Sequence, residues 1–104
     1  MSKGRIYIAG PITGHDLPER WSAFKAYENF FLDNGYEVVN PMELPHNHDK
    51  SWSAYMRECI PALCQCDYIF LMKDWYTSEG ARMEFDISMK LGIKPITQDF
   101  KQIK

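Results

Sequence analysis

The side chains best suited to chemistry lie in residues 74–84, where a polar loop leads into a predicted helix. Glu84 falls in the second turn of that helix. The residues that share its helix face, three or four positions away, are mostly small: Gly80, Ala81, Ile87 and Ser88. A carboxylate on such a face can lie close to a sheet, and the positive end of the helix dipole favours its ionised form. An ionised carboxylate is what a nucleophile toward a sugar carbon must be.

Two residues at the start of this helix add to the candidate site. Gly80 has no side chain, which lets a ligand approach the backbone N–H groups, and the Ser78 hydroxyl can cap the helix or bind a sugar hydroxyl or a phosphate. The alternative is that Glu84 pairs with Arg82, Lys90 or another cation and that Ser78 is only a cap. The pattern by itself favours this simpler alternative.

The loop at residues 10–14 is a second candidate, because it follows a predicted strand and contains Gly10 and Gly14. It matches neither the dinucleotide-binding fingerprint nor the Walker phosphate-binding loop. A tight turn that needs two glycines explains it more simply. Tyr7, in the strand before the loop, points inward or outward depending on the register of the strand, and a phenol in a strand is usually a packing residue.

The residue types of a zinc site are present in His46, His48, Cys64 and Cys66. Neither pair has the Cys-x-x-Cys or His-x-x-x-His spacing that zinc sites use. The sequence therefore predicts no metal ion, and it gives no indication of a cofactor.

The composition is that of an ordinary globular protein, with 45% apolar and 25% charged residues in a chain of 104. This length predicts one domain, residues 1–104, in which binding and catalysis share one core. The net charge is −2, and lysines and arginines form no cluster. These features argue against duplex DNA or an anionic membrane as the main partner.

The three cysteines cannot all pair within the chain, and Cys64 and Cys66 are separated by one residue, so we expect no disulfide framework. The apolar segment at residues 6–9 is far shorter than the roughly 20 residues that cross a bilayer. Both features predict a cytoplasmic protein.

Apolar segments and helical patterns alternate along the chain. We predict strands at residues 5–9, 36–39, 67–72 and around 95–96, and helices at about 16–34, 51–63 and 79–91. Asp16 and Glu19 resemble a capping box at the start of the first helix. Pro61 predicts that the second helix is kinked or restarted there.

This order predicts an α/β fold, a Rossmann-like or flavodoxin-like three-layer sandwich whose mainly parallel sheet has four strands, or at most five. Ligands of such sheets bind outside the carboxyl ends of the strands. That rule selects the loops at residues 10–14, 40–49 and 73–80.

Four segments together carry a family resemblance: residues 5–14, Asn40-Pro41, Cys66-Asp67, and the Trp-x-x-Ser-x-Gly-Ala-Arg-x-Glu pattern of residues 75–84. They resemble a family of small phage and bacterial proteins, mostly of unassigned function. This family is grouped with the nucleoside 2-deoxyribosyltransferases and the 2'-deoxynucleoside 5'-phosphate N-hydrolases. The resemblance spans about residues 5–96.

The resemblance implies an enzyme of nucleotide metabolism, a hydrolase or transferase that acts on the N-glycosidic bond of a deoxynucleoside or deoxynucleotide. By this resemblance Glu84 attacks the sugar and forms a glycosyl-enzyme intermediate, with Tyr7 nearby. Ser78 matches a position that binds the sugar or its phosphate. The opposite wall of the site is formed by Gly10 and the loop after it, which includes Pro11 and Ile12. The resemblance also implies a homo-oligomer, because the relatives complete their sites with residues of a neighbouring subunit.

The chain departs from the family where the relatives carry a second catalytic carboxylate, an Asp, because Cys59 occupies that position. This departure supports an alternative, a nucleotide-binding protein without turnover. Pro11 and Thr13 replace a Ser and an Arg of the phosphate-recognising relatives, which argues against a monophosphate preference. The high aromatic content, 14%, leaves open a third alternative, a purely structural module or one that binds a partner.

Overall fold

Four parallel strands form the sheet in the computed structural model, which describes residues 2–12, 14–45 and 51–97. The strand order within this part of the chain is β2-β1-β3-β4, and each neighbouring pair is parallel. The strands are β1 Arg5–Ala9, β2 Glu37–Val39, β3 Tyr68–Leu71 and β4 Lys94–Thr97. This is the order of flavodoxin-like sheets, and it confirms the predicted fold class.

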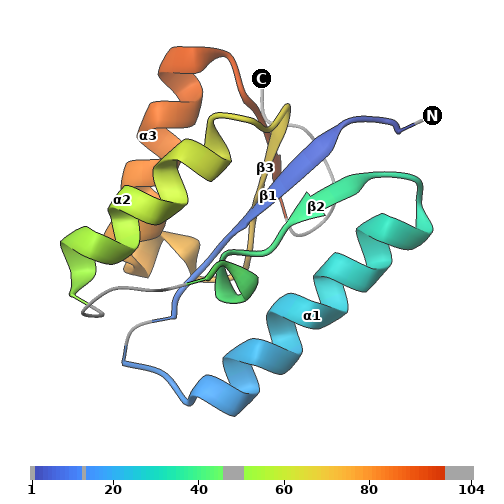
Figure 1. Ribbon diagram of the computed structural model, residues 1–104. Coiled ribbons are helices and arrows are strands. Elements are labelled where there is room, and N and C mark those ends of the chain that lie inside the picture. The colour runs from blue at the N-terminus through green and yellow to red at the C-terminus, as the bar shows by residue number, and fades with distance from the viewer. Residues whose placement is uncertain (1, 13, 46–50, 98–104) are drawn as a thin grey trace.

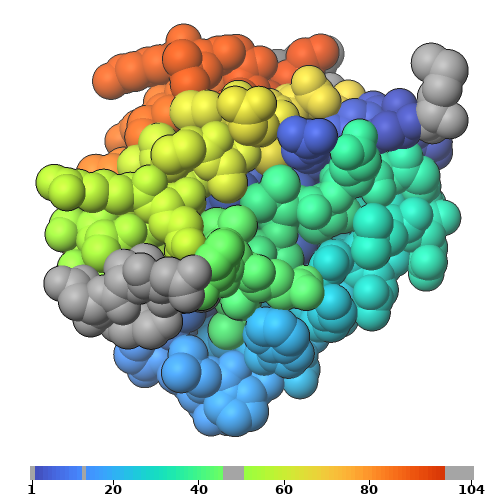
Figure 2. All heavy atoms as spheres, in the orientation of Figure 1, coloured from blue at the N-terminus to red at the C-terminus, as the bar shows by residue number. Residues whose placement is uncertain are grey.

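Helices cover both faces of the sheet (Figure 1). The helices are α1 Leu17–Asp33, α2 Trp52–Leu63 and α3 Glu79–Leu91, with short 3-10 turns η1 Pro41–Glu43 and η2 Trp75–Thr77. Helix α1 packs on one face, and α2 and α3 lie together on the other. Figure 2 shows η1 on the surface between α1 and α2. The three-layer arrangement is therefore the predicted one.

Strand β1 divides its side chains between two cores, because successive residues of a strand point to opposite faces. Ile6 and Ile8 pack toward α1 with Phe24 and Phe70. Tyr7 packs on the opposite face, in the core that α2 and α3 cover. The register of β1 thus directs the phenol of Tyr7 toward α3.

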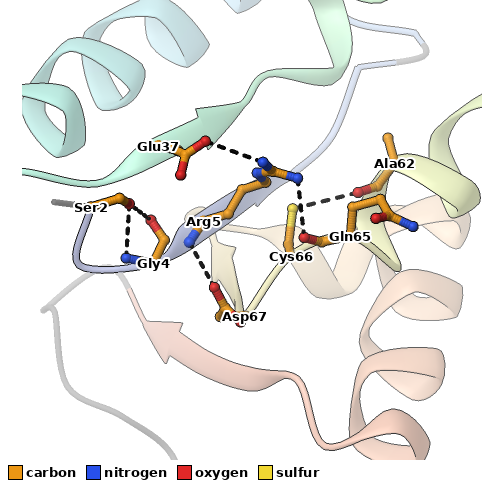
Figure 3. Close-up of polar contacts among 8 residues, drawn as sticks. All are labelled: Ser2, Gly4, Arg5, Glu37, Ala62, Gln65, Cys66 and Asp67. Atoms are coloured by element: carbon orange, nitrogen blue, oxygen red, sulfur yellow. Dashed lines mark hydrogen bonds and ion pairs between the residues drawn. The ribbon is translucent and has the colours of Figure 1, made fainter.

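The amino-terminal edge of the sheet is held by Arg5, as Figure 3 shows. Its backbone N–H donates to the carboxylate of Asp67 at 2.9 Å, and its guanidinium donates to Glu37 at 3.1 Å and to the carbonyl of Gln65 at 3.4 Å. These contacts join β1 to β2 and to the turn before β3. Asp67 therefore has a structural role at the edge opposite the carboxyl ends of the strands.

One local prediction was wrong, and one of the two alternatives predicted at Pro61 is excluded. The capping box of α1 does not form, because the Glu19 carboxylate pairs with the guanidinium of Arg20 at 2.7 Å, and Asp16 makes no side-chain cap. Pro61 does not restart α2, since it lies in the last turn of one continuous helix. Near that end a proline removes a backbone hydrogen bond from the final turn only.

Helix α3 has the predicted bounds. The hydroxyl of Ser78 accepts a hydrogen bond from the N–H of Ala81 at 3.2 Å, and Gly92 ends the helix in the left-handed conformation with φ 74°. Within the described residues, no helix has the length and apolar character that a membrane crossing requires.

Candidate active site

A buried hydrogen bond joins the sheet to α3 at the centre of the site. The hydroxyl of Tyr7 donates to Oε2 of Glu84 at 2.5 Å. Tyr7 is fully buried and Glu84 is 6% exposed. The strand register and the second turn of α3 bring these two groups together, and each is positioned by an element packed in the core.

Burial raises the pKa of Glu84 to about 7, and the hydrogen bond from Tyr7 lowers it in part. Removal from water disfavours the charged form of a carboxylate. The helix dipole, which by itself favours an ionised Glu84, is thus opposed by desolvation. Burial and the nearby carboxylate also raise the pKa of Tyr7 well above its ordinary value of 10.0, so the phenol stays a hydrogen-bond donor at neutral pH.

Glu84 forms no ion pair with any described residue. Arg82 instead donates to the backbone carbonyl of Tyr76 at 2.8 Å, and Lys90 is exposed in the last turn of α3. The alternative in which Glu84 is neutralised on the surface by a neighbouring cation is therefore wrong.

A cavity of about 130 Å³ lies against Glu84. It is lined by Tyr7, Ile8, Gly10, Ile12, Pro41, Trp52, Tyr55, Met56, Cys59, Ser78, Gly80, Ala81 and Glu84. Each of the three loops selected from the sequence contributes at least one of these residues. The cavity therefore lies at the carboxyl ends of β1, β2 and β3, the position expected for a ligand of such a sheet.

Two glycines of the lining let neighbouring methionine side chains pack closely against the backbone. A Cβ atom on Gly10 would lie 2.7 Å from the sulfur of Met72, and one on Gly80 would lie 3.1 Å from the sulfur of Met56. Gly80 thus serves the contact between α3 and α2 as well as the cavity. Ser78 lines the cavity while its oxygen caps α3, and its O–H can still donate.

The structure does not bring all the predicted residues to the cavity. Pro11 is buried outside the lining, and its carbonyl accepts a hydrogen bond from Arg20 at 3.3 Å. Thr13 and the loop residues 46–50, with His46 and His48, lie outside the described residues.

The family described as "Domain of unknown function (DUF4406)" matches residues 4–97. The chain belongs to this family. A comparison with curated protein sequences found no match.

The DUF4406 chain shares its fold with a 2-deoxyribosyltransferase from the psychrotolerant bacterium Bacillus psychrosaccharolyticus. The two structures superpose with a TM-score of 0.68 over 89% of this chain and 70% of that one, at 22% sequence identity. The likeness confirms the deoxyribosyltransferase-like fold that the sequence motifs predicted.

One wall of the DUF4406 cavity was not predicted from the sequence. Trp52, Tyr55, Met56 and Cys59 come from a single face of α2, at helical spacing. This spacing alone could have indicated a shared face, but not that the face borders a cavity. The sequence indicates Cys59 only as the position of a missing carboxylate. The structure places it in the lining, 1% exposed.

The Cys59 thiol is neutral at physiological pH, because burial raises its pKa to about 12. All three cysteines are free thiols. Among the described residues of the DUF4406 chain, no three His, Cys, Asp or Glu side chains gather as metal ligands would.

Proposed function

We propose that this DUF4406 protein cleaves or transfers the N-glycosidic bond of a deoxynucleoside or deoxynucleotide, with Glu84 as the nucleophile. The observation that carries the proposal is the geometry of the carboxylate. Oε2 accepts from Tyr7, and no described residue donates to Oε1. One oxygen is thus held in place while the other is left for reaction. The fold shared with a 2-deoxyribosyltransferase supports the same chemistry.

The reaction follows from these positions. Oε1 of Glu84 attacks the anomeric carbon, the C–N bond breaks, and its electron pair departs with the base. The glycosyl-enzyme intermediate is then resolved by water in a hydrolase or by a second base in a transferase. Ser78 has a hydroxyl proton to donate to a sugar hydroxyl or a phosphate, and Gly10 with Ile12 borders the opposite side of the cavity.

The ionisation of Glu84 suits this role. With a pKa of about 7, both forms of the carboxyl group are populated at neutral pH. A buried carboxylate is also poorly hydrated, so an attack loses little solvation. Tyr7 favours the reactive ionised form through its hydrogen bond.

A second candidate function is nucleotide binding without turnover. Glycoside-cleaving sites normally use two carboxylates, one of which manages the proton of the leaving group. Glu84 is the only carboxylate among the described residues that line the cavity, and the Cys59 thiol is not acidic enough to replace a second one.

We also propose that copies of the chain associate. Large apolar side chains are exposed along α1, where Leu17 is 59%, Trp21 43% and Leu32 48% exposed. Light scattering coupled to size exclusion would give the mass in solution. A monomer at all concentrations would refute the association.

The experiment that tests the enzymatic proposal is Glu84→Gln, with Glu79→Gln as the matched control. Glu79 lies exposed in the first turn of the same helix. Free base released from a panel of deoxynucleosides and their 5'-monophosphates is measured by chromatography. We expect release by the wild type and by Glu79→Gln, and none by Glu84→Gln with its circular dichroism unchanged.

Two further measurements separate the enzyme from the binder. Intact-protein mass spectrometry during turnover should show a mass increase of one deoxyribosyl group, absent in Glu84→Gln. Calorimetry with the same panel identifies a binder if the nucleotide binds tightly and is recovered intact. Release of base by Glu84→Gln at the wild-type rate would rule out Glu84 as the nucleophile.

A further inference from the structure

The described lining of the cavity has an unusual charge composition. It contains one carboxylate, Glu84, and no lysine, arginine or histidine. The other polar side chains are the phenols of Tyr7 and Tyr55, the Ser78 hydroxyl, the Cys59 thiol and the indole of Trp52, which are neutral groups. The remaining surface is apolar. Within the described residues, the cavity is therefore a neutral, partly aromatic enclosure with a single group that can carry negative charge.

This composition poses a problem for an uncharged base. When its C–N bond breaks, the electron pair stays on the ring nitrogen, so the base departs as an anion unless an acid protonates it. The Tyr7 proton is already donated to Glu84, and burial raises the pKa of the Cys59 thiol to about 12. Burial also raises the pKa of the Tyr55 phenol above its ordinary value of 10.0. Among the described lining residues, no group is suited to supply that proton at neutral pH.

We infer that this site takes N-glycosides whose base carries a fixed positive charge in its ring, such as a pyridinium or an N-alkylated purine. The inference rests on the proposed function and names its substrate class. When the C–N bond of such a substrate breaks, the electron pair neutralises the ring and the base leaves uncharged, with no proton required. Glu84 bonds to the anomeric carbon. Water then adds its oxygen to that carbon, releases one proton to solvent and restores the carboxylate.

The walls of the cavity match such a ring. Trp52 and Tyr55, both from α2, offer aromatic surfaces, and a cation over an aromatic face is attracted by the ring quadrupole. The Glu84 carboxylate attracts the same charge in a site largely removed from water, where Coulomb interactions are stronger than in solution. A bound cation also favours the ionised form of Glu84, which burial otherwise disfavours. The substrate would thus help to ionise its own nucleophile.

A matched pair of substrates tests the inference: 2'-deoxyguanosine and 7-methyl-2'-deoxyguanosine, which differ in one methyl group and the fixed charge. Each enzymatic rate is divided by the spontaneous rate of the same nucleoside, which removes the intrinsic lability of the methylated base. We expect the acceleration to be at least about 100-fold greater for the charged nucleoside, the size of a general-acid contribution. Cys59→Asp, which adds an acid beside the leaving group, should reduce this ratio at least about 10-fold by accelerating the uncharged substrate.

Binding provides an independent measurement. Calorimetry should show that 1-methylnicotinamide, a stable pyridinium cation, binds more tightly than nicotinamide, and that Glu84→Gln removes the difference. Equal acceleration of the two nucleosides, or equal binding of the two pyridines, would overturn the inference while leaving Glu84 as a nucleophile. Base release that is the same in wild type and Glu84→Gln for both nucleosides would instead refute the proposed function itself.

Discussion

Tyr7 and Glu84, which lie 77 positions apart in the sequence, share a buried hydrogen bond of 2.5 Å between the centre of the sheet and helix α3. Two effects oppose each other at this bond. Burial favours the neutral carboxyl group, and the phenol favours the carboxylate. Tyr7 is therefore a positioning residue that also sets the pH at which the proposed nucleophile becomes active.

Replacing Tyr7 by Phe should raise the pKa of Glu84 further above its present value of about 7. The substitution removes the donor that stabilises the ionised form, while the ring that fills the core remains. In a pH–rate profile, the rising limb of base release should move to higher pH, with part of the lost rate recovered in alkaline buffer.

The control for this variant is Tyr27→Phe, because Tyr27 packs on the other face of the sheet with Phe70. Its profile should coincide with that of the wild type. An unshifted limb in Tyr7→Phe would show that the phenol does not tune Glu84.

Stability should fall as the pH rises from about 4.5 to about 7, because of Glu84. The ordinary pKa of this group is 4.5, and in the folded protein it is about 7, so the folded state binds the proton more tightly. Within this window the native state must give up its extra proton, and the cost is on the order of 3 kcal/mol. Below this window the Glu84 carboxyl group is protonated in both the folded and the unfolded protein, and above it the group is ionised in both.

Urea denaturation at several pH values between 4 and 8 checks this expectation. Glu84→Gln should show a smaller decline than the wild type, because only groups such as Glu43, whose pKa is also raised, still contribute, and Glu79→Gln should retain the full decline. Three other groups titrate above this pH window. The pKa of Cys59 is about 12, that of Tyr7 is well above 10.0, and burial also raises that of Tyr55. An identical pH dependence of stability in wild type and Glu84→Gln would contradict the raised pKa of Glu84 in the folded protein.

Helix ends that are determined by adjacent residues could be predicted from the sequence. Ser78 and Gly92 fix the ends of α3 through a side-chain cap and a left-handed terminal residue, and both depend only on adjacent residues. At Asp16 and Glu19, in contrast, the local pattern does not give the observed structure. The capping pattern is present, but the guanidinium of Arg20 binds the carboxylate that the box would need.

The parts of the site that depend on packing could not be predicted. The orientation of Tyr7 depends on the register of β1, since a shift of one residue would turn it toward α1. The α2 wall depends on how that helix lies against α3, where Gly80 meets Met56. The raised pKa of Glu84 results from the burial that this packing creates, so no local pattern indicates it.

Ser78→Ala and Ser51→Ala form a matched pair that separates capping from ligand binding. Both hydroxyls accept a hydrogen bond from a backbone N–H three residues on, at 3.2 Å, but only Ser78 lines the cavity. Each variant should lose about 1 kcal/mol of unfolding free energy. Only Ser78→Ala should also weaken nucleotide binding in calorimetry. Equal affinities in the two variants would show that Ser78 is a cap and nothing more.

Gly10→Ala should destabilise the fold more than Gly80→Ala. At Gly10 the new methyl group would lie 2.7 Å from the sulfur and 3.0 Å from the Cβ atom of Met72, which is 3% exposed and cannot move freely. Such overpacking costs about 1 to 3 kcal/mol. At Gly80 the nearest atom is the sulfur of Met56 at 3.1 Å, near the end of a flexible side chain, and alanine favours the helix by up to about 1 kcal/mol. Urea denaturation should therefore place Gly80→Ala near the wild type and Gly10→Ala well below it, whereas equal stabilities would show that Met72 yields without cost.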